Sequence, residues 1–167
     1  MPVVRSARGE ATFSRDRRFR YSLTRTLAPG DRVIAFVMLN PSTADAFADD
    51  PTIKKCIKYA TRLGGAALRV VNLFALRATD PAELALPTSA RAGANATNDA
   101  AIRAAVRDAH VVIAAWGVHG GRFDEHARVR GPSGPLAGVP LRHLGLTRDG
   151  FPRHPLYRRD DQRLAIW

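Results

Sequence analysis

Cysteine and lysine are scarce in this sequence, and long apolar runs are absent. Cys56 is the only cysteine, which excludes an internal disulfide and any zinc or iron–sulfur site built from cysteines alone. No apolar stretch approaches the roughly 20 residues that a membrane-spanning helix needs. The N-terminal segment MPVVRSARGE lacks the apolar core of a signal peptide. The sequence therefore predicts a globular protein of the reducing cytoplasm with no membrane partner.

Familiar nucleotide and metal motifs are also missing. The chain contains neither G-x-x-x-x-G-K-[ST] nor G-x-G-x-x-G, so neither a phosphate-binding loop nor a Rossmann dinucleotide site is predicted. No histidine forms an i, i+4 pair with a carboxylate, the spacing expected of a helical zinc site. Asp45, Asp49 and Asp50 could hold a magnesium ion, but Asp50 is better explained as a helix cap. We therefore expect no metal and no cofactor.

Arginine, in contrast, is abundant. The 167 residues include 26 basic and 15 acidic side chains, a net charge of +11, and all but three of the basic residues are arginines. Guanidinium groups bind phosphates in a bidentate fork, and a basic surface attracts polyanions. We therefore expect contact with a nucleic acid or a nucleotide. The alternative is that the arginine content reflects the base composition of a GC-rich genome.

Short apolar runs alternate with helical patterns along the chain. An antiparallel hairpin is expected over residues 11–27, and apolar runs over 32–39, 68–76 and 109–117 predict buried strands. Asp50 and Pro51 predict the start of a helix that ends at Gly64-Gly65. We expect a single domain over residues 1–167. Its predicted fold is α/β, with three layers, a short, mainly parallel central sheet and an N-terminal β-hairpin.

Polar residues occur near the carboxyl ends of the predicted strands. Asn40 follows the first buried run, Asn72 lies within the second, Trp116 and Gly117 close the third, and His154 follows the last expected strand. Ligands of open α/β sheets bind beyond the carboxyl ends of the strands, so these residues are expected to share a pocket. Each alone has a plainer explanation, such as a turn at Asn40 or a hydrogen-bonded core amide at Asn72.

Longer motifs carry a resemblance to known families. The strings MLNPSTADAFADDPTI, VVNLFALRATDP, WG, LGLTRDG and RHPLY resemble, in order and spacing, a bacterial family of uncharacterised domain proteins, over nearly the whole chain. The same order resembles the uracil-DNA glycosylase superfamily, in which the strands carry a G-x-N-P-like motif, an Asn and a Trp-Gly pair, and a late loop carries His-Pro. This second resemblance implies a uracil-DNA-glycosylase-like fold. It also implies a hydrolase of DNA repair that acts on a base flipped out of DNA.

The superfamily resemblance implies a role for each matching residue. Asn40 would position the attacking water, His154 would donate a hydrogen bond to the leaving base, and Asn72 would pair with the edge of the flipped base. The other substrate-binding residues expected are Pro41, Ser42, Trp116 and either Phe47 or Phe74, one of which would stack on the base. The nucleic-acid-binding residues expected are Arg153, Leu156, Tyr157, Arg158 and Arg159, with Leu156 or Tyr157 as a wedge in the base stack.

Departures from the superfamily pattern leave the substrate open. Met38 replaces the leading glycine of the first motif, and Ser42 stands where relatives often have glycine after the proline. These changes put uracil itself in doubt and leave a modified or damaged base as the expected substrate. The alternatives are an enzyme or binder of a free nucleoside or nucleotide on the same fold, and a noncatalytic nucleic-acid-binding module. The positive charge favours DNA as the partner, and a monomer is favoured.

Overall fold

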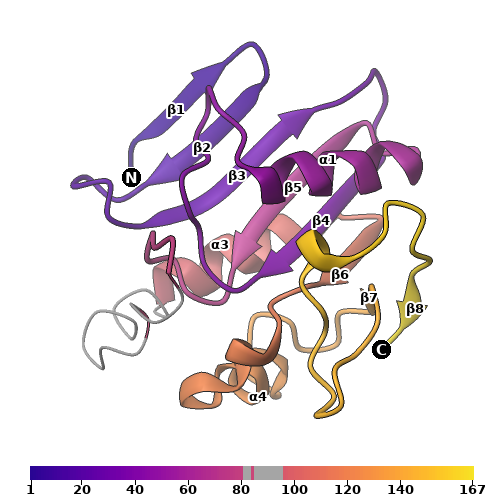
Figure 1. Ribbon diagram of the computed structural model, residues 1–167. Helices are drawn as coiled ribbons and strands as arrows, with labels where there is room; N and C mark the ends of the chain where they lie inside the picture. The colour runs from indigo at the N-terminus through magenta and orange to yellow at the C-terminus, as the bar shows by residue number, and fades with distance from the viewer. Residues whose placement is uncertain (81–83, 85–95) are drawn as a thin grey trace.

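The computed structural model describes residues 1–80, 84 and 96–167 and contains one mixed sheet (Figure 1). The strands are β1 (Val3–Ser6), β2 (Gly9–Phe13), β3 (Arg20–Thr26), β4 (Val33–Met38), β5 (Ala67–Asn72), β6 (Val111–Ala114), β7 (Leu141–His143) and β8 (Ala165–Ile166). The helices are α1 (Pro51–Arg62), α3 (Ala96–Val106) and α4 (Glu125–Arg130), with short 3-10 helices η2 (Val118–Asp124) and η3 (Pro155–Tyr157). The strand order is β1-β2-β3-β5-β4-β6-β7-β8.

The sheet is parallel only in its centre. β5, β4, β6 and β7 run parallel to one another, whereas β1–β2, β2–β3, β3–β5 and β7–β8 pair antiparallel. Among the described strands, antiparallel neighbours therefore outnumber parallel ones, and the prediction of a mainly parallel sheet is wrong. The physical reason is that the N-terminal hairpin joins the sheet through β3, and β8 adds an antiparallel edge. The α/β class and the N-terminal hairpin are confirmed.

Helices cover both faces of the parallel centre (Figure 1). α1 places Ile53, Cys56 and Tyr59 in one core cluster with Ile34 and Phe36 of β4. On the opposite face α3 contributes Ile102, Ala105 and Val106 to a second cluster, which also holds Ala35 and Val37 of β4. Successive strand residues point to opposite faces, so covering both faces buries all six residues of β4. This is why β4 reads as a continuous apolar run.

α1 begins and ends where its sequence predicts. The Asp50 carboxylate accepts a hydrogen bond from the Ile53 amide at 2.8 Å, and Pro51 is the first helical residue. After the helix, Gly64 has a φ of +71°, a backbone conformation that favours glycine. The Asp50 cap fixes the connection from β4 into α1 at the carboxyl edge of the sheet, and Gly64 begins the connection from α1 to β5 at the opposite edge.

The strand order reverses beside β4. This reversal leaves a crevice at the carboxyl end of β4. The chain passes from β4 through α1 to β5 on one side, and later through α3 to β6 on the other side. The connections that leave β4 and β6 therefore diverge, and α/β sheets bind ligands at such a switch point. The residues that follow β4, β5 and β6 meet there with the segment after β7.

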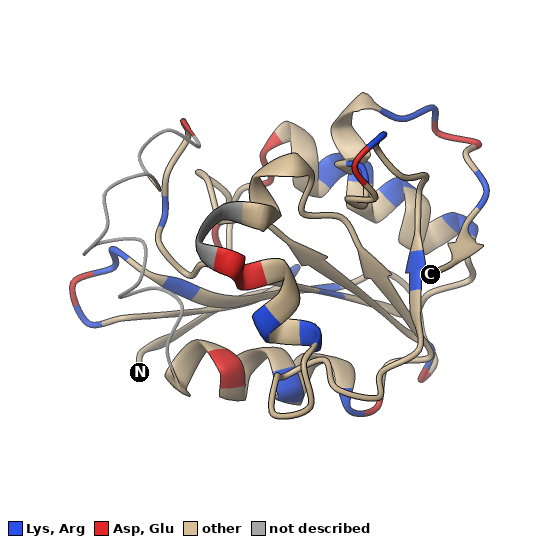
Figure 2. Ribbon diagram, turned by 90° about the horizontal axis from the view of Figure 1, so that it is seen from below, with Lys and Arg blue, Asp and Glu red and all other residues tan. Residues whose placement is uncertain are grey.

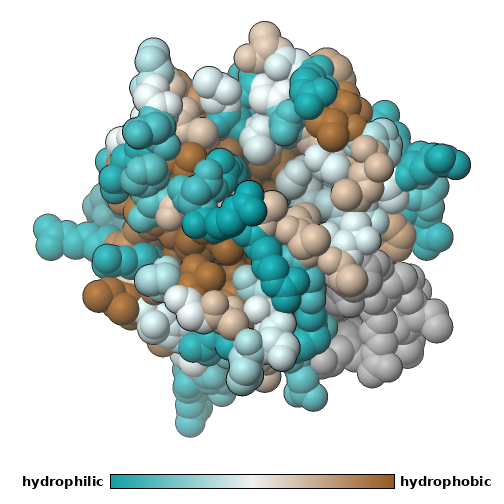
Figure 3. Space-filling model, turned by 180° about the vertical axis from the view of Figure 1, so that it is seen from behind, coloured by the Kyte–Doolittle hydropathy of each residue, from teal (hydrophilic) through white to brown (hydrophobic). Residues whose placement is uncertain are grey.

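The surface alone does not locate a site. Basic residues lie on several sides of the molecule (Figure 2), and hydrophilic side chains surround a smaller apolar area on the back face (Figure 3). Within the described residues, no helix is both long enough and apolar enough to span a bilayer. The crevice at the switch point, where α/β sheets bind ligands, is therefore the candidate functional site.

Candidate functional site

A cavity of about 440 Å³ lies at the carboxyl edge of β4, β5 and β6. Asn40, Asn72, Trp116 and His154 all line it, so the residues that were expected to share a pocket do share one. Other residues that the resemblance pointed to also line this cavity, namely Ser42, Arg153, Leu156, Tyr157 and Arg158. Segments far apart in the sequence thus converge on one site.

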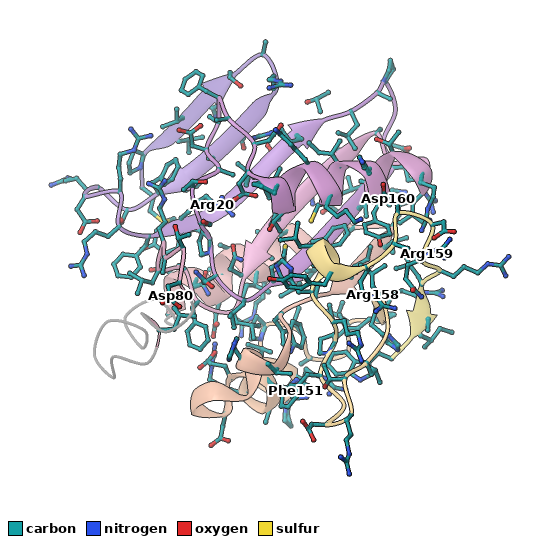
Figure 4. All side chains as sticks on the ribbon, viewed as in Figure 1. Arg20, Asp80, Phe151, Arg158, Arg159 and Asp160 are labelled. Carbon is teal, nitrogen blue, oxygen red and sulfur yellow. The ribbon has the colours of Figure 1, made fainter. Side chains whose placement is uncertain are left out.

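Four of the residues expected in the site do not line the cavity. Phe47 is 61% exposed, and Phe74 is fully buried in the core cluster on the α3 face. Neither ring is therefore placed to stack on a base in the cavity. Pro41 is buried, and the Arg159 guanidinium pairs with the Asp161 carboxylate at 3.0 Å on the exposed segment beside α1 (Figure 4).

The Asn40 side chain is held by the protein backbone in one orientation. Its Nδ2 donates to the carbonyl of Ala78 at 2.7 Å and to the carbonyl of Pro41 at 3.1 Å. Two carbonyl acceptors on one atom identify that atom as the amide nitrogen. The amide oxygen Oδ1 makes no hydrogen bond with the described residues. Asn40 therefore offers a fixed acceptor at the cavity.

Asn72 is a buried amide whose oxygen is unsatisfied. It is the last residue of β5, opposite Met38 of β4, and only 2% of it is exposed. Its Oδ1 has no hydrogen-bond partner among the described residues. Leaving a buried acceptor unpaired costs about 1–3 kcal/mol. Because Asn72 lines the cavity, a ligand that donates a hydrogen bond to its Oδ1 would remove this cost.

A second asparagine, Asn98, supports the strand end beneath the cavity. Its Nδ2 donates to the backbone carbonyls of Asn72 and Leu73, both at 2.9 Å. The α3 pattern in the sequence suggests Asn98 or Thr97 as a helix cap, but α3 begins earlier, at Ala96. Asn98 is instead buried and bonded to the strand. Sequence reasoning therefore missed its function as a support for Asn72.

His154 presents a neutral imidazole to the cavity. Its Nδ1 accepts a hydrogen bond from the Leu156 amide at 3.3 Å, so in the neutral ring the proton is on Nε2. Burial lowers the pKa of His154 to about 4, although the nearby Asp50 carboxylate acts in the opposite direction. At neutral pH the side chain is therefore an uncharged hydrogen-bond donor.

This burial predicts the pH dependence of His154. We expect NMR titration of its ring to show a midpoint near pH 4 instead of the ordinary 6.5. As the pH falls, His154 is protonated in the unfolded chain near pH 6.5 but in the folded protein only near pH 4. The neutral, buried ring therefore contributes to the stability of the fold above pH 6.5, and this contribution is lost as the pH falls towards 4. His154→Asn keeps an acceptor for the Leu156 amide but cannot be protonated, so its unfolding free energy should fall less across this window. A ring midpoint near the ordinary value would contradict the prediction.

Arg20 lines the cavity but was not predicted to be in the site. Thr12 pairs with Ser22, and Phe13 pairs with Arg20, so Tyr21 is an extra residue in β3. Such a β-bulge re-aims the side chains that follow or precede it. Strict alternation would place the Arg20 side chain on the same face of the sheet as Ser22. Because of the bulge, it lies on the same face as Phe13 instead. The alternation in the sequence contains no signal for this shift.

The acidic residues before α1 stabilise the loop that contains them. The Asp45 carboxylate accepts hydrogen bonds from the amides of Phe47 and Ala48 at 2.8 and 2.9 Å. Asp49 pairs with the buried Arg25 guanidinium at 2.8 Å. The described residues contain no group of three or more His, Cys, Asp or Glu side chains that could hold a metal ion. Asp45, which the sequence offered only as a possible magnesium ligand, therefore stabilises a turn.

Trp116 forms a rigid wall of the cavity. Its indole Nε1 donates to Nδ1 of His126 at 3.1 Å, and the ring centroid of Trp167 lies 5.4 Å away. A Cβ atom at Gly120 would lie 2.1 Å from the Trp116 ring, so glycine is needed where η2 passes the indole. Trp116 is only 1% exposed. It therefore shapes the cavity from within the core.

Most of the residues that line the cavity lie within the part of the chain that matches one family model. The model of a family described as "Protein of unknown function (DUF1643)" matches residues 20–156. The chain belongs to this family. The match includes Arg20, Asn40, Asn72, Trp116 and His154, and it confirms the predicted membership of an uncharacterised family. No curated protein and no solved structure shows a significant match to the DUF1643 chain.

Proposed function

We propose that the cavity is the active site of a DNA glycosylase-like hydrolase that releases a modified or damaged base. One observation carries the proposal: Asn40, Asn72 and His154, from three separate segments, line the same cavity. Each has a hydrogen-bonding atom that the described protein groups leave unused. The base would be flipped out of the DNA stack to enter this site, because its glycosidic bond is not accessible within a duplex.

The reaction needs a placed water more than a strong base. As the bond between C1′ and the base nitrogen breaks, its electron pair stays on the base and positive charge develops on the sugar. Water then bonds to C1′, and its proton ends on the released base. Asn40 Oδ1 would accept a hydrogen bond from this water and hold it near C1′. Correct placement alone supplies a large part of such a rate enhancement.

His154 would stabilise the leaving base without transferring a proton. Its low pKa keeps the ring neutral at neutral pH, so Nε2–H can donate to an oxygen or nitrogen on which negative charge develops. A donor that is already in position stabilises such a transition state at no reorganisation cost. Asn72 would pair with the base in both ground state and transition state, and it would therefore contribute mainly to base selection.

Basic and exposed apolar side chains at the cavity support DNA as the substrate. Arg153 and Arg158 line it from the segment around η3, in the region labelled by Arg158 in Figure 4. Tyr157 of η3 is 81% exposed and Leu156 is 38% exposed. Arginines next to such residues can contact the phosphates on either side of a flipped nucleotide.

The decisive experiment is a base-release assay on a substrate panel. Single- and double-stranded oligonucleotides carrying deaminated, oxidised or alkylated bases would be incubated with the protein. Free base would be measured by mass spectrometry, and abasic sites by alkaline strand cleavage. Release from one or more oligonucleotides supports the proposal. Release only from free nucleosides or nucleotides would favour a monomer-acting enzyme, and DNA binding without any release would favour a noncatalytic module.

DNA binding should depend strongly on salt. Each phosphate contact contributes about 0.9 to the slope of log affinity against log salt concentration. We therefore expect Arg153→Gln to lower the magnitude of this slope by about 1 without changing base preference. Arg107→Gln is the control, because Arg107 is exposed after α3, next to the amino end of β6. If fluorescence anisotropy detects no binding even at low salt, DNA as the substrate must be abandoned.

A further inference from the structure

We propose that Arg20 and Asn72 together form a subsite for a 6-oxopurine, a base that presents two adjacent acceptors to the arginine. This inference rests on the proposed function, because it names the base class that the same cavity would take. Both side chains line the cavity, and both are 2% exposed. They come from neighbouring strands, since β3 pairs with β5.

Arg20 has donors that the protein does not use. Its Nη1 donates to the Ala44 carbonyl at 2.8 Å, while its Nε is buried and has no partner in the described part of the chain. Its Nη2 forms no hydrogen bond with the described residues. Nε–H and Nη2–H lie on the same edge of the planar guanidinium and point in parallel. This edge can therefore donate to two neighbouring acceptor atoms at once.

The charge of Arg20 also favours an acceptor-rich ligand. Burial lowers the pKa of Arg20 to about 10, with the Asp50 carboxylate opposing the shift, so the side chain remains cationic at neutral pH. The Asp50 carboxylate itself caps α1 through the Ile53 amide at 2.8 Å. A buried cation that is incompletely hydrogen-bonded is costly. A ligand that brings two lone pairs to the free edge removes part of this cost.

The two side chains fit the two edges of one base. In a 6-oxopurine, O6 and N7 are adjacent acceptors, the pair that arginine binds in a bidentate manner. The neighbouring N1–H and the second lone pair of O6 match the oxygen and nitrogen of the Asn72 amide. Adenine has an amino donor at position 6 instead of O6, and uracil has only a carbon–hydrogen bond beside O4. The combination of Arg20 and Asn72 therefore selects hypoxanthine- or guanine-like bases.

The wild-type protein can test this subsite without any substitution. Isothermal titration would compare hypoxanthine with 7-deazahypoxanthine, adenine and uracil. Loss of N7 removes one hydrogen bond from a charged donor, and such bonds contribute about 1.5–3 kcal/mol. We therefore expect at least about tenfold weaker binding of the deaza compound, with adenine and uracil also weaker. No measurable hypoxanthine binding, or equal affinity for hypoxanthine and its deaza analogue, would overturn the inference.

A conservative variant assigns the preference to Arg20. Arg20→Lys keeps the charge but loses the parallel donors, so the preference for N7 should fall to near unity. Arg142→Lys is the matched control, because Arg142 is exposed on β7, and this variant should keep the wild-type preference. If inorganic phosphate competes with hypoxanthine and binds as tightly, the cavity holds an anion and the base subsite is wrong. If Arg20→Lys is unfolded by circular dichroism, the wild-type comparison alone decides.

The results separate this inference from the proposed function. Release of bases from DNA without any preference for 6-oxopurines would overturn the subsite and leave the hydrolase standing. Binding of hypoxanthine that depends on N7 and Arg20, without release of any base from DNA, would leave the subsite standing and overturn the hydrolase.

Discussion

Asn40→Ala should lower the single-turnover rate of base release by about 100-fold or more while DNA affinity changes only a few fold. The Asn40 amide is bonded to the carbonyls of Ala78 and Pro41, so its Oδ1 is held in place before substrate binds. Alanine removes the acceptor that positions the water and leaves the rest of the cavity intact. A quenched-flow assay with enzyme in excess measures the rate, and fluorescence anisotropy measures affinity on the same oligonucleotide.

The same substitution also removes two hydrogen bonds of the protein, so a control is needed. Thr43→Ala changes an exposed residue of the same connection, and Thr43 is not among the residues that line the cavity. We expect this variant to retain the wild-type rate. If Asn40→Ala instead loses affinity and melting temperature together with rate, Asn40 holds the loop near Ala78 and does not position water.

The residues of the candidate site that could be predicted from the sequence are those that end parallel strands. Asn40 and Asn72 stand out because an amide directly after or within a buried apolar run is costly unless it has a definite partner. Strand ends of a parallel sheet meet at one edge, so their convergence follows from the fold class. His154 could be placed near them only through the motif resemblance, because its loop follows β7, a strand of three residues.

Other parts of the molecule depend on contacts that a linear pattern does not contain. The bulge at Tyr21 reverses the face of Arg20, and no residue type in FRYSL signals it. Phe47 and Phe74 were candidates for stacking because both are aromatic and close to the motifs. Their exposure depends on whether the local chain faces solvent or α3. The two-residue strand β8 is defined by its pairing with β7. This pairing is a long-range contact, and two residues are too few to show an alternating pattern in the sequence.

Asn72→Leu should raise the free energy of unfolding and weaken the binding of the base. Leucine has a similar shape and removes the buried amide oxygen, which no described group of the protein pairs with. Relieving an unsatisfied buried group is worth about 1–2 kcal/mol, which corresponds to a rise in melting temperature of about 2–8 °C for a chain of this size. The same change removes both hydrogen bonds to the edge of the base, so we expect hypoxanthine affinity to fall by at least about tenfold. Calorimetry of unfolding and isothermal titration measure the two effects.

The second buried amide is the matched control for this prediction. Asn98 donates to the carbonyls of Asn72 and Leu73, so Asn98→Leu leaves two buried acceptors without these donors and should destabilise the protein. The two substitutions are chemically identical and lie on adjoining elements, yet their stability changes should have opposite signs. A similar destabilisation by both would mean that the Asn72 amide supports the fold. Opposite signs would mean that this protein keeps Asn72 at the expense of its own stability, and a ligand that pairs with the amide is then the physical reason for it.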